Sequence, residues 1–206
     1  MSENYLAAEK SPVILASGSK TRATVLKNAG VEFEQISPRV DEEEVKLSMQ
    51  AAGASAVDTA VALAELKALK ISKDYPEHLV IGADQMLECN GIWFDKPVDM
   101  SHAKAHLTSL KGKTHSLHNG ICIAKTGTVI WHHTDEARLT MRNFTEDFQD
   151  HYLASAGEPI LSSVGGYQLE GLGSQLFRKI EGDFFSILGL PLLPLLDFLR
   201  GHKVVL

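Results

Sequence analysis

The segment VILASGSKTR at residues 13–22 combines an apolar run, a turn rich in hydroxyl groups and the start of a helix. Such a turn points backbone N–H groups, together with the hydroxyls of Ser17 and Ser19, at the space above the helix N-terminus. The helix dipole and Arg22 favour an anion there, so the segment indicates a phosphate site without the glycine patterns of P-loop or dinucleotide-binding turns. An ordinary turn with Ser19 as the helix N-cap is the alternative that this segment alone leaves open.

Composition limits the class of protein. The 206-residue chain is 44% hydrophobic, enough for a substantial core in one domain covering residues 1–206. Its net charge of -6 disfavours a broad surface for extended nucleic acid. Cys89 and Cys122 match no metal or redox spacing, so we expect reduced thiols in a cytoplasmic protein without a signal peptide. The nearest candidate for a membrane span, residues 187–199, contains two prolines and an aspartate and is too short.

Strands and helices alternate along the chain, which predicts an α/β fold. The apolar residues 79–83 predict a buried strand that ends at Asp84, and residues 37–44 are expected to form a polar loop. The remaining expected elements are strands at residues 13–16 and 33–36, a hairpin turn at Asn90 and Gly91, helices starting near Asp58, Ser101 and Thr145, and a last helix from Pro191 to Gly201.

Charged residues near the predicted strand ends are candidates for chemistry. Asp84 directly follows a buried strand, where ligands bind in α/β sheets, so its carboxylate is a candidate base or metal ligand, or else a turn residue. The acidic residues 41–44 are typical of a solvated loop, but a second carboxylate near Asp84 would let Mg²⁺ bind between carboxylate oxygens and a substrate phosphate. Lys67 and Lys96 could meet phosphates as point charges or extend into solvent.

Seven blocks of residues span nearly the whole chain in a characteristic order: LASGSKTR at 15–22, SPRVDE at 37–42, ALAELKA at 62–68, IGADQ at 81–85, DKP at 95–97, LKGKTH at 110–115 and EGLGSQLFRKIEGDFFSILGLPL at 170–192. With these blocks the chain resembles the Maf family of nucleoside triphosphate pyrophosphatases, first described as septum-formation inhibitors. The ordered set is far more specific than any single motif.

The resemblance implies an activity and a fold. It implies hydrolysis of a nucleoside triphosphate between its α and β phosphates, which releases the monophosphate and pyrophosphate. The implied fold is an elongated mixed α/β structure with two lobes around a deep cleft, similar to the inosine triphosphate pyrophosphatases. The implied partners are a small-molecule nucleotide and a divalent cation, Mg²⁺ or Mn²⁺, with a homodimer as a possible assembly.

The family's catalytic positions correspond to residues of this sequence. Asp84 matches the acid expected to activate the attacking water or to hold the metal, and Glu42 matches a second metal or water contact. Five residues match the groups that bind the triphosphate: Ser17, Ser19, Arg22, Lys67 and Lys96. Such a cluster suits phosphoanhydride hydrolysis, because positioning and electrostatic stabilisation supply most of that catalysis.

Three positions that differ between the family's subgroups concern the base: Thr21, Gln85 and Glu170. Gln85 and Glu170 match the subgroup acting on 7-methyl-GTP, whereas Thr21 stands where that subgroup typically has a large aromatic residue. A carboxylate at Glu170 suits a methylated guanine, whose N1–H and amine donate hydrogen bonds and whose ring is cationic. Tyr167 resembles the pyrimidine subgroup, so a dTTP or UTP pyrophosphatase is the alternative.

The sequence also bears on two other classes of function. Lys20, Ser162 and Ser163 depart from the common family pattern and favour a nucleotide-binding regulator of cell division with little turnover. The full set of charged site residues outweighs that reading, because a binding module does not need it. A polymer-directed nuclease is disfavoured by the acidic balance of the chain. The histidines match no metal-ligand spacing.

Overall fold

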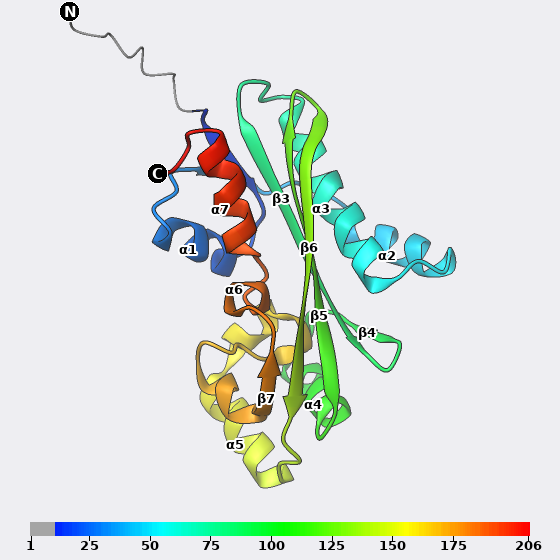
Figure 1. Cartoon of the computed structure of the whole chain (residues 1–206). Helices are drawn as coiled ribbons and strands as arrows, with labels where there is room; N and C mark the ends of the chain where they lie inside the picture. Colours follow the sequence, from blue (N-terminus) through cyan, green and yellow to red (C-terminus); the bar gives the residue numbers. More distant parts are fainter. Residues whose placement is uncertain (1–10) are drawn as a thin grey trace, which may run out of the picture.

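A mixed seven-stranded sheet forms the centre of the protein in the computed structural model, which describes residues 11–206 (Figure 1). Its strands are β1 (Val13–Ala16), β2 (Glu34–Gln35), β3 (Leu79–Cys89), β4 (Ile92–Phe94), β5 (Thr114–Lys125), β6 (Thr128–Met141) and β7 (Phe177–Glu181). Strands β2, β1 and β3 are parallel, and β3, β5, β6 and β7 follow as antiparallel neighbours. Strand β4 forms a hairpin with β3 beside this path.

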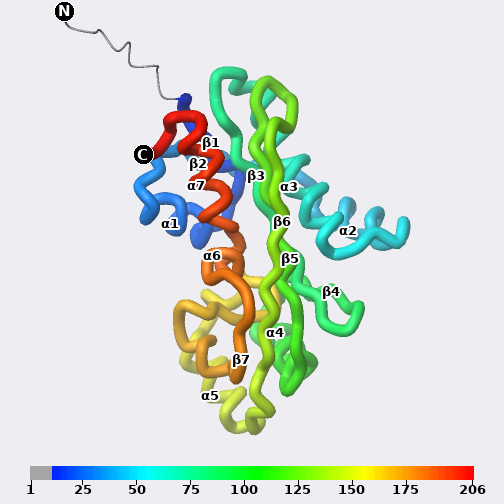
Figure 2. Tube along the Cα trace, viewed as in Figure 1, coloured from blue at the N-terminus to red at the C-terminus, as the bar shows by residue number. Residues whose placement is uncertain are grey.

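Helices cover both faces of the sheet and both ends of its long strands. They are α1 (Lys20–Asn28), α2 (Glu42–Ala51), α3 (Ala56–Ser72), α4 (Met100–Leu110), α5 (Glu146–Ala156), α6 (Phe184–Ile187) and α7 (Leu192–Gly201), with 3-10 helices η1 (Glu158–Ser162), η2 (Val164–Gly166) and η3 (Leu172–Leu176). Figure 2 shows β1, β2, α1 and α7 together in the upper part, whereas α4, α5 and β7 lie in the lower part. Strands β3, β5 and β6 run through both parts, so the molecule is elongated (Figures 1 and 2).

Alternation along β1 builds two layers of core in the upper lobe. Leu15 packs with Leu26 of α1 and Leu195 of α7 on one face of the sheet. Its neighbour Ile14 points to the opposite face and packs with Ala64 of α3. Both faces of β1 are therefore buried, which explains its uninterrupted apolar sequence.

The lower lobe has its own core. Leu87, Leu117 and Leu139 come from the far halves of β3, β5 and β6 and pack together with side chains from α4 and α5. Tyr167 closes this core from the segment after η2. Because the same three strands contribute to the upper core, the sheet joins the two lobes directly.

Two glycines let α3 approach the sheet very closely. A Cβ atom at Gly82 of β3 would lie 2.1 Å from the backbone oxygen of Ala64, and one at Gly120 of β5 would lie 2.6 Å from the backbone of Ala60. No larger residue fits either position without moving the helix. This contact fixes the height at which Lys67, one turn along α3, meets the strands.

The expected α/β class and the elongated mixed sheet flanked by helices are confirmed, and so are the hairpin at Asn90 and Gly91 and the helix start at Thr145. The strand predicted to end at Asp84 instead continues to Cys89, because the antiparallel partner β5 prolongs it past the end of β1. Asp84 therefore lies within a strand and is not a turn residue.

Other boundaries also differ from the expectations. The predicted polar loop at residues 37–44 ends early, since Asp41 caps α2 by accepting a hydrogen bond from the backbone N–H of Glu44. Helix α3 is capped by Ser55, which forms a capping box with Asp58, and helix α4 is capped by Asp99 rather than Ser101. No helix within residues 11–206 is long and apolar enough to cross a membrane.

Candidate functional site

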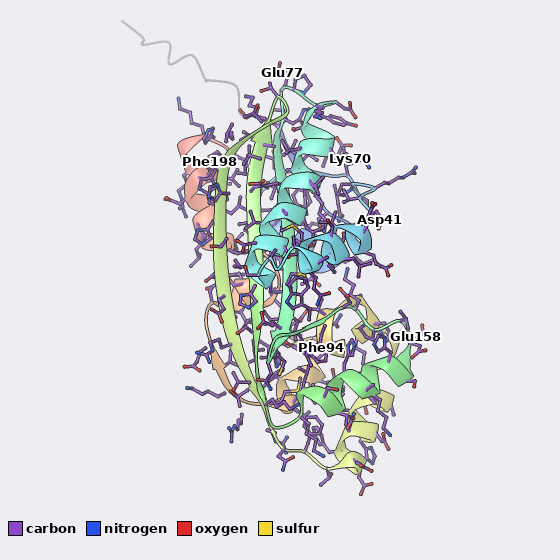
Figure 3. All side chains as sticks on the ribbon, turned by 90° about the vertical axis from the view of Figure 1, so that its right-hand side faces the viewer. Asp41, Lys70, Glu77, Phe94, Glu158 and Phe198 are labelled. Atoms are coloured by element: carbon purple, nitrogen blue, oxygen red, sulfur yellow. The ribbon has the colours of Figure 1, made fainter. Side chains whose placement is uncertain are left out.

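A cavity of about 1050 Å³ lies between the two lobes. The upper lobe contributes the turn at residues 17–22, the start of α2 and Lys67 of α3, and the lower lobe contributes residues 95–98 and 159–170. In Figure 3, Asp41 just before α2 and Glu158 at the start of η1 lie on the same side of the molecule, with Asp41 in the upper part and Glu158 below it. Every site residue predicted from the sequence lines this cavity.

The turn before α1 is tightly organised around its two serines. The hydroxyl oxygen of Ser19 accepts a hydrogen bond from the backbone N–H of Arg22 at 3.3 Å, so Ser19 is the N-cap of α1. Ser17 Oγ accepts from Ser19 N at 3.2 Å and from Arg22 Nη1 at 3.3 Å. The guanidinium also donates from Nε to the carbonyl oxygen of Gly189 at 2.7 Å. The capping interpretation of Ser19 is thus confirmed, and the same turn faces the cavity.

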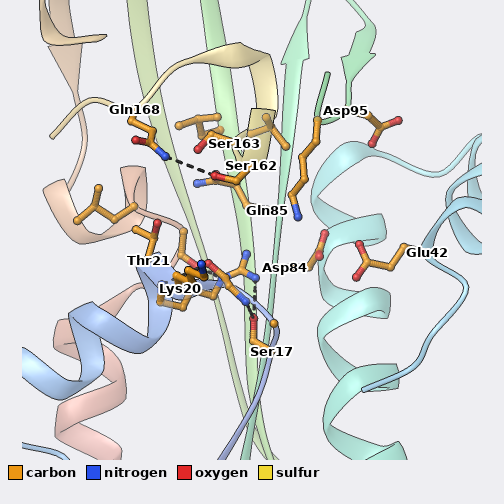
Figure 4. Close-up of a pocket in the computed structure, with 18 of the residues that line it drawn as sticks. Ser17, Lys20, Thr21, Glu42, Asp84, Gln85, Asp95, Ser162, Ser163 and Gln168 are labelled. Atoms are coloured by element: carbon orange, nitrogen blue, oxygen red, sulfur yellow. Dashed lines mark hydrogen bonds between the residues drawn. The ribbon is translucent and has the colours of Figure 1, made fainter. Parts of the chain in front are cut away.

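Three charged groups meet on the opposite wall of the cavity. Lys67 Nζ lies 2.6 Å from Asp84 Oδ1 and 2.7 Å from Glu42 Oε1. The lysine and Asp84 are buried, whereas Glu42 is partly exposed at the first position of α2. Figure 4 shows the Asp84 and Glu42 side chains side by side, facing Lys20 and Thr21 across the pocket. The structure therefore brings together the two predicted acids.

Neighbouring charges tune this wall. Burial opposes ionisation of Glu42, but Lys67, Lys96 and Lys46 outweigh it and lower the pKa of Glu42 below its ordinary value. Burial lowers the pKa of Lys96, and the nearby cations Arg22 and Lys67 lower it further against the attraction of Glu42. A bound anion would offset the repulsion between Lys96 and the neighbouring cations, so this wall is suited to a polyanion.

The carboxylate oxygens of this wall are potential ligands for a divalent cation. Asp84 Oδ1 is bound by Lys67, but its buried Oδ2 has no hydrogen-bond partner among the described residues. An unpartnered carboxylate oxygen is a suitable ligand for Mg²⁺ or Mn²⁺, and Glu42, whose Oε1 lies 2.7 Å from Lys67 Nζ, brings a second carboxylate to the same wall. No cluster of three or more His, Cys, Asp or Glu residues suited to a metal occurs in the described part of the chain. Substrate phosphates and water would therefore have to complete the coordination.

The residues expected to contact the base line the cavity from both lobes. Gln85 follows Asp84 on β3, Thr21 lies in the first turn of α1, and Glu170 is exposed on the lower rim. Figure 4 shows Gln85 between Thr21 and the lower-lobe residues Ser162 and Ser163.

Comparison with known proteins identifies the family. The model of the Maf-like protein family matches residues 12–202, which is almost the whole described chain. The chain belongs to the Maf-like family. A nucleoside triphosphate pyrophosphatase of Paramagnetospirillum magneticum is 56% identical over 92% of this chain and 97% of its own length. One of Granulibacter bethesdensis is 53% identical over 94% and 98%. A 7-methyl-GTP pyrophosphatase of Rhizobium johnstonii is 48% identical over 91% and 94%.

The Maf-like site contains residues that sequence reasoning did not select. Lys46 of α2 pairs with Asp95 of the β4–α4 connection at 2.5 Å and so joins the two lobes beside the cavity. The Asn119 side chain is completely buried behind Gln85. Neither residue stands out in a sequence: Lys46 lies in α2, a helix that the sequence analysis does not predict, and a lone Asn in a strand carries no spacing signal.

Proposed function

We propose that this Maf-like protein hydrolyses a nucleoside triphosphate to the monophosphate and pyrophosphate. The observation that carries the proposal is the pairing, in one cavity, of a buried carboxylate with a free oxygen and a set of cations from both lobes. The names of the pyrophosphatases at 53% and 56% identity support the same activity. Arg22, Lys67 and Lys96 would neutralise the triphosphate and the charge that develops on the leaving pyrophosphate.

Asp84 is the proposed base. Lys67 holds Oδ1, which leaves Oδ2 to accept a proton from a water molecule. The water oxygen then forms a bond to the α phosphorus. The bond between the α phosphorus and the oxygen that bridges the α and β phosphates breaks, and that oxygen leaves with the pyrophosphate. The lysine orients this carboxylate, while its second contact holds Glu42 in place.

Asp84 and Glu42 are the residues that would hold Mg²⁺ or Mn²⁺, and Asp84 Oδ2 would then bind the cation in place of the proton. When bound, the cation would neutralise phosphate charge and polarise the phosphoryl group. Arg22 and the Ser17–Ser19 turn remain on the other side of the cavity, where their N–H groups and hydroxyls can bind phosphate oxygens directly.

A methylated guanine nucleotide such as 7-methyl-GTP is the proposed substrate. Glu170 offers a carboxylate on the cavity rim to guanine donors, and the Rhizobium relatives are named for this activity. The contrary hint from Tyr167 is weaker, because its side chain is buried and its hydroxyl is already hydrogen-bonded to His115 Nε2 at 2.7 Å. Thr21 removes a stacking surface, and dTTP or UTP hydrolysis is the alternative.

The deciding experiment measures pyrophosphate release from a panel of nucleoside triphosphates with Mg²⁺ or Mn²⁺. We expect release from at least one of them, and Asp84→Asn should lower turnover by about 10² or more because it removes the base. Asp150→Asn is the matched control, since Asp150 forms an exposed ion pair with Lys104 on the lower lobe. No release across a panel that includes modified nucleotides would instead favour a low-turnover regulator.

A further inference from the structure

Helix α2 has few contacts with the rest of the protein, although it carries Glu42, a proposed ligand of the cation. The structure describes the whole helix, and none of its residues is buried. Val45 packs at the edge of a small apolar cluster from α3 and β3, and Glu42 contacts Lys67. A helix with so little buried apolar surface depends on polar contacts for its position.

Lys46 supplies such a contact. It lies one turn after Glu42, so the two side chains project from the same face of α2, and both line the cavity. Lys46 Nζ lies 2.5 Å from Oδ1 of Asp95, which belongs to the lower lobe. Burial opposes the charge of Lys46, but the hydrogen bond and attraction of Asp95, with help from Asp84 and Glu42, raise the pKa of Lys46 above its ordinary value. The ammonium group is therefore charged and paired at neutral pH.

The two sides of the cavity carry complementary charges. Along α2 the acid Glu42 is followed one turn later by the base Lys46, and the β4–α4 connection presents Asp95 and Lys96. Asp95 binds Lys46, and the charge of Lys96 reaches Glu42. Glu42 and Lys96 are the groups proposed to engage the cation and a phosphate, so substrate binding competes with their mutual attraction. The Lys46–Asp95 pair has no part in those contacts and remains as a direct connection between the lobes.

The lower end of the Lys46–Asp95 pair is anchored in the lower lobe. The carbonyl oxygen of Asp95 accepts a hydrogen bond from the backbone N–H of Gly165 at 3.4 Å. Gly165, in η2, has a φ of +76° and lies so close to the core that a Cβ atom there would be 2.7 Å from Leu87 Cδ1. Asp95 is thus joined to a segment that packs against the lower core, and its ion pair connects this segment to α2.

We propose that Lys46 and Asp95 are positioning residues whose ion pair holds α2, and with it Glu42, at a fixed place opposite Lys96 across the cavity. Neither residue of the pair has to touch the reacting atoms. A triphosphate and its cation bind best to groups that are already in place, because ordering a mobile helix would oppose binding. This inference rests on the proposed function, since it concerns the binding of a triphosphate in the same cavity.

Direct binding of phosphate by Lys46 is the alternative that the experiment has to separate. A direct contact needs a positive charge at position 46, whereas positioning needs two opposite charges at positions 46 and 95 in either order. The wild type is therefore compared with a charge-exchanged variant, Lys46→Asp/Asp95→Lys, and a neutral variant, Lys46→Met/Asp95→Asn. All three proteins have the same net charge, so general attraction of a polyanion is equal in them.

The first measurement is the affinity for GTP with a methylene group between the α and β phosphates, which the enzyme cannot cleave, determined by calorimetry with Mg²⁺. We expect the neutral variant to bind about threefold to fivefold more weakly than the wild type, the range typical of a partly exposed ion pair. The charge-exchanged variant should bind within about twofold of the wild type, because it restores the pair. Lys104→Met/Asp150→Asn is the matched control, since it removes an exposed ion pair on the lower lobe away from the cavity.

The second measurement follows the position of α2 without a ligand. Spin labels are attached at Ser48→Cys on α2 and Ser109→Cys on α4, two exposed positions, whereas the native Cys89 and Cys122 are buried and should not react. The distribution of distances between the labels should be equally narrow in the wild type and the charge-exchanged variant. It should be broader in the neutral variant and unchanged in the Lys104→Met/Asp150→Asn control.

Equal affinities and equal distance distributions in the three proteins would overturn the inference. A charge-exchanged variant that binds as weakly as the neutral one, or more weakly, would overturn it in favour of direct phosphate binding by Lys46. Should the charge-exchanged variant fail to fold, the single variants Lys46→Met and Asp95→Asn complete a double-mutant cycle with the neutral variant, and additive effects would have the same meaning. A wild type that binds no nucleotide, with the expected order of label distances, would refute the proposed function alone.

Discussion

Lys67 Nζ lies 2.6 Å from Asp84 Oδ1, and this contact connects α3 to the central strand β3 inside the cavity wall. Both side chains are buried, so each charge depends on the other for its stability. The lysine reaches this depth because Gly82 and Gly120 bring α3 against the sheet. The packing of a helix on two glycines thus determines which oxygen of the proposed base remains free.

Lys67→Met should lower the free energy of unfolding by about 3 to 5 kcal/mol, because it leaves the buried carboxylate of Asp84 without its partner. The double variant Lys67→Met/Asp84→Asn should be more stable than the single one, since the unpaired charge is gone. Urea denaturation at neutral pH measures both. Lys104→Met, which breaks an exposed pair with Asp150, should remain close to the wild type. A Lys67→Met protein as stable as the wild type would show that the pair does not hold these elements together.

The site could be predicted from sequence as far as the motifs extend. The family blocks contain Asp84, Glu42 and Lys67, and the cavity brings them together. What the sequence could not supply were contacts between segments far apart in the chain, such as Gln85 with the carbonyl of Ser186. Every residue carries the same backbone carbonyl group, so no pattern of side chains predicts which carbonyl will accept a given hydrogen bond.

The errors in the fold have a similar cause. Residues 79–83 show the apolar run of a strand buried on both sides, but β3 continues through polar residues because β5 pairs with it as far as Glu88. Local composition therefore predicts that the strand ends at Asp84. The place of Asp84 within the strand instead depends on its pairing with Gly120, about thirty-six residues further along the chain. Strand extension set by a neighbouring strand is invisible to local propensity.

Gly82→Ala should be strongly destabilising. The added Cβ would lie 2.1 Å from the backbone oxygen of Ala64, so α3 would have to move away from β3. Overpacking of this kind costs about 1 to 3 kcal/mol or more, and a displaced α3 should also weaken the Lys67–Asp84 contact and lower turnover. Gly201→Ala is the control, because its Cβ would meet nothing within 4 Å at the end of α7. Equal thermal stability of the two variants would argue against tight packing at Gly82.

Protonation of His115 should limit stability in mild acid. Burial lowers the pKa of His115 from 6.5 to about 4. The unfolded chain therefore binds a proton between about pH 6.5 and 4 that the folded protein does not, so stability should fall as the pH is lowered through this range, by about 3 kcal/mol in total. Unfolding free energies measured at pH 7.5 and 4.5 should differ less in His115→Gln than in the wild type. His132→Gln, at an exposed position of β6, should retain the wild-type slope, and an identical slope in all three proteins would rule out His115 as the cause.

Glu170→Gln tests the proposed base preference. If Glu170 accepts hydrogen bonds from the guanine edge, the N–H₂ group of the new amide would face a guanine N–H group. The value of kcat/KM for 7-methyl-GTP should then fall roughly 5- to 150-fold, which corresponds to about 1 to 3 kcal/mol. Values for dTTP, UTP and CTP should change little, because these bases lack the paired N1–H and amine. Glu158→Gln is the matched control, since Glu158 is exposed beside the cavity without lining it. A uniform loss over all substrates would assign Glu170 a structural role, and a wild-type preference for dTTP or UTP would reject the guanine assignment while leaving the pyrophosphatase activity in place.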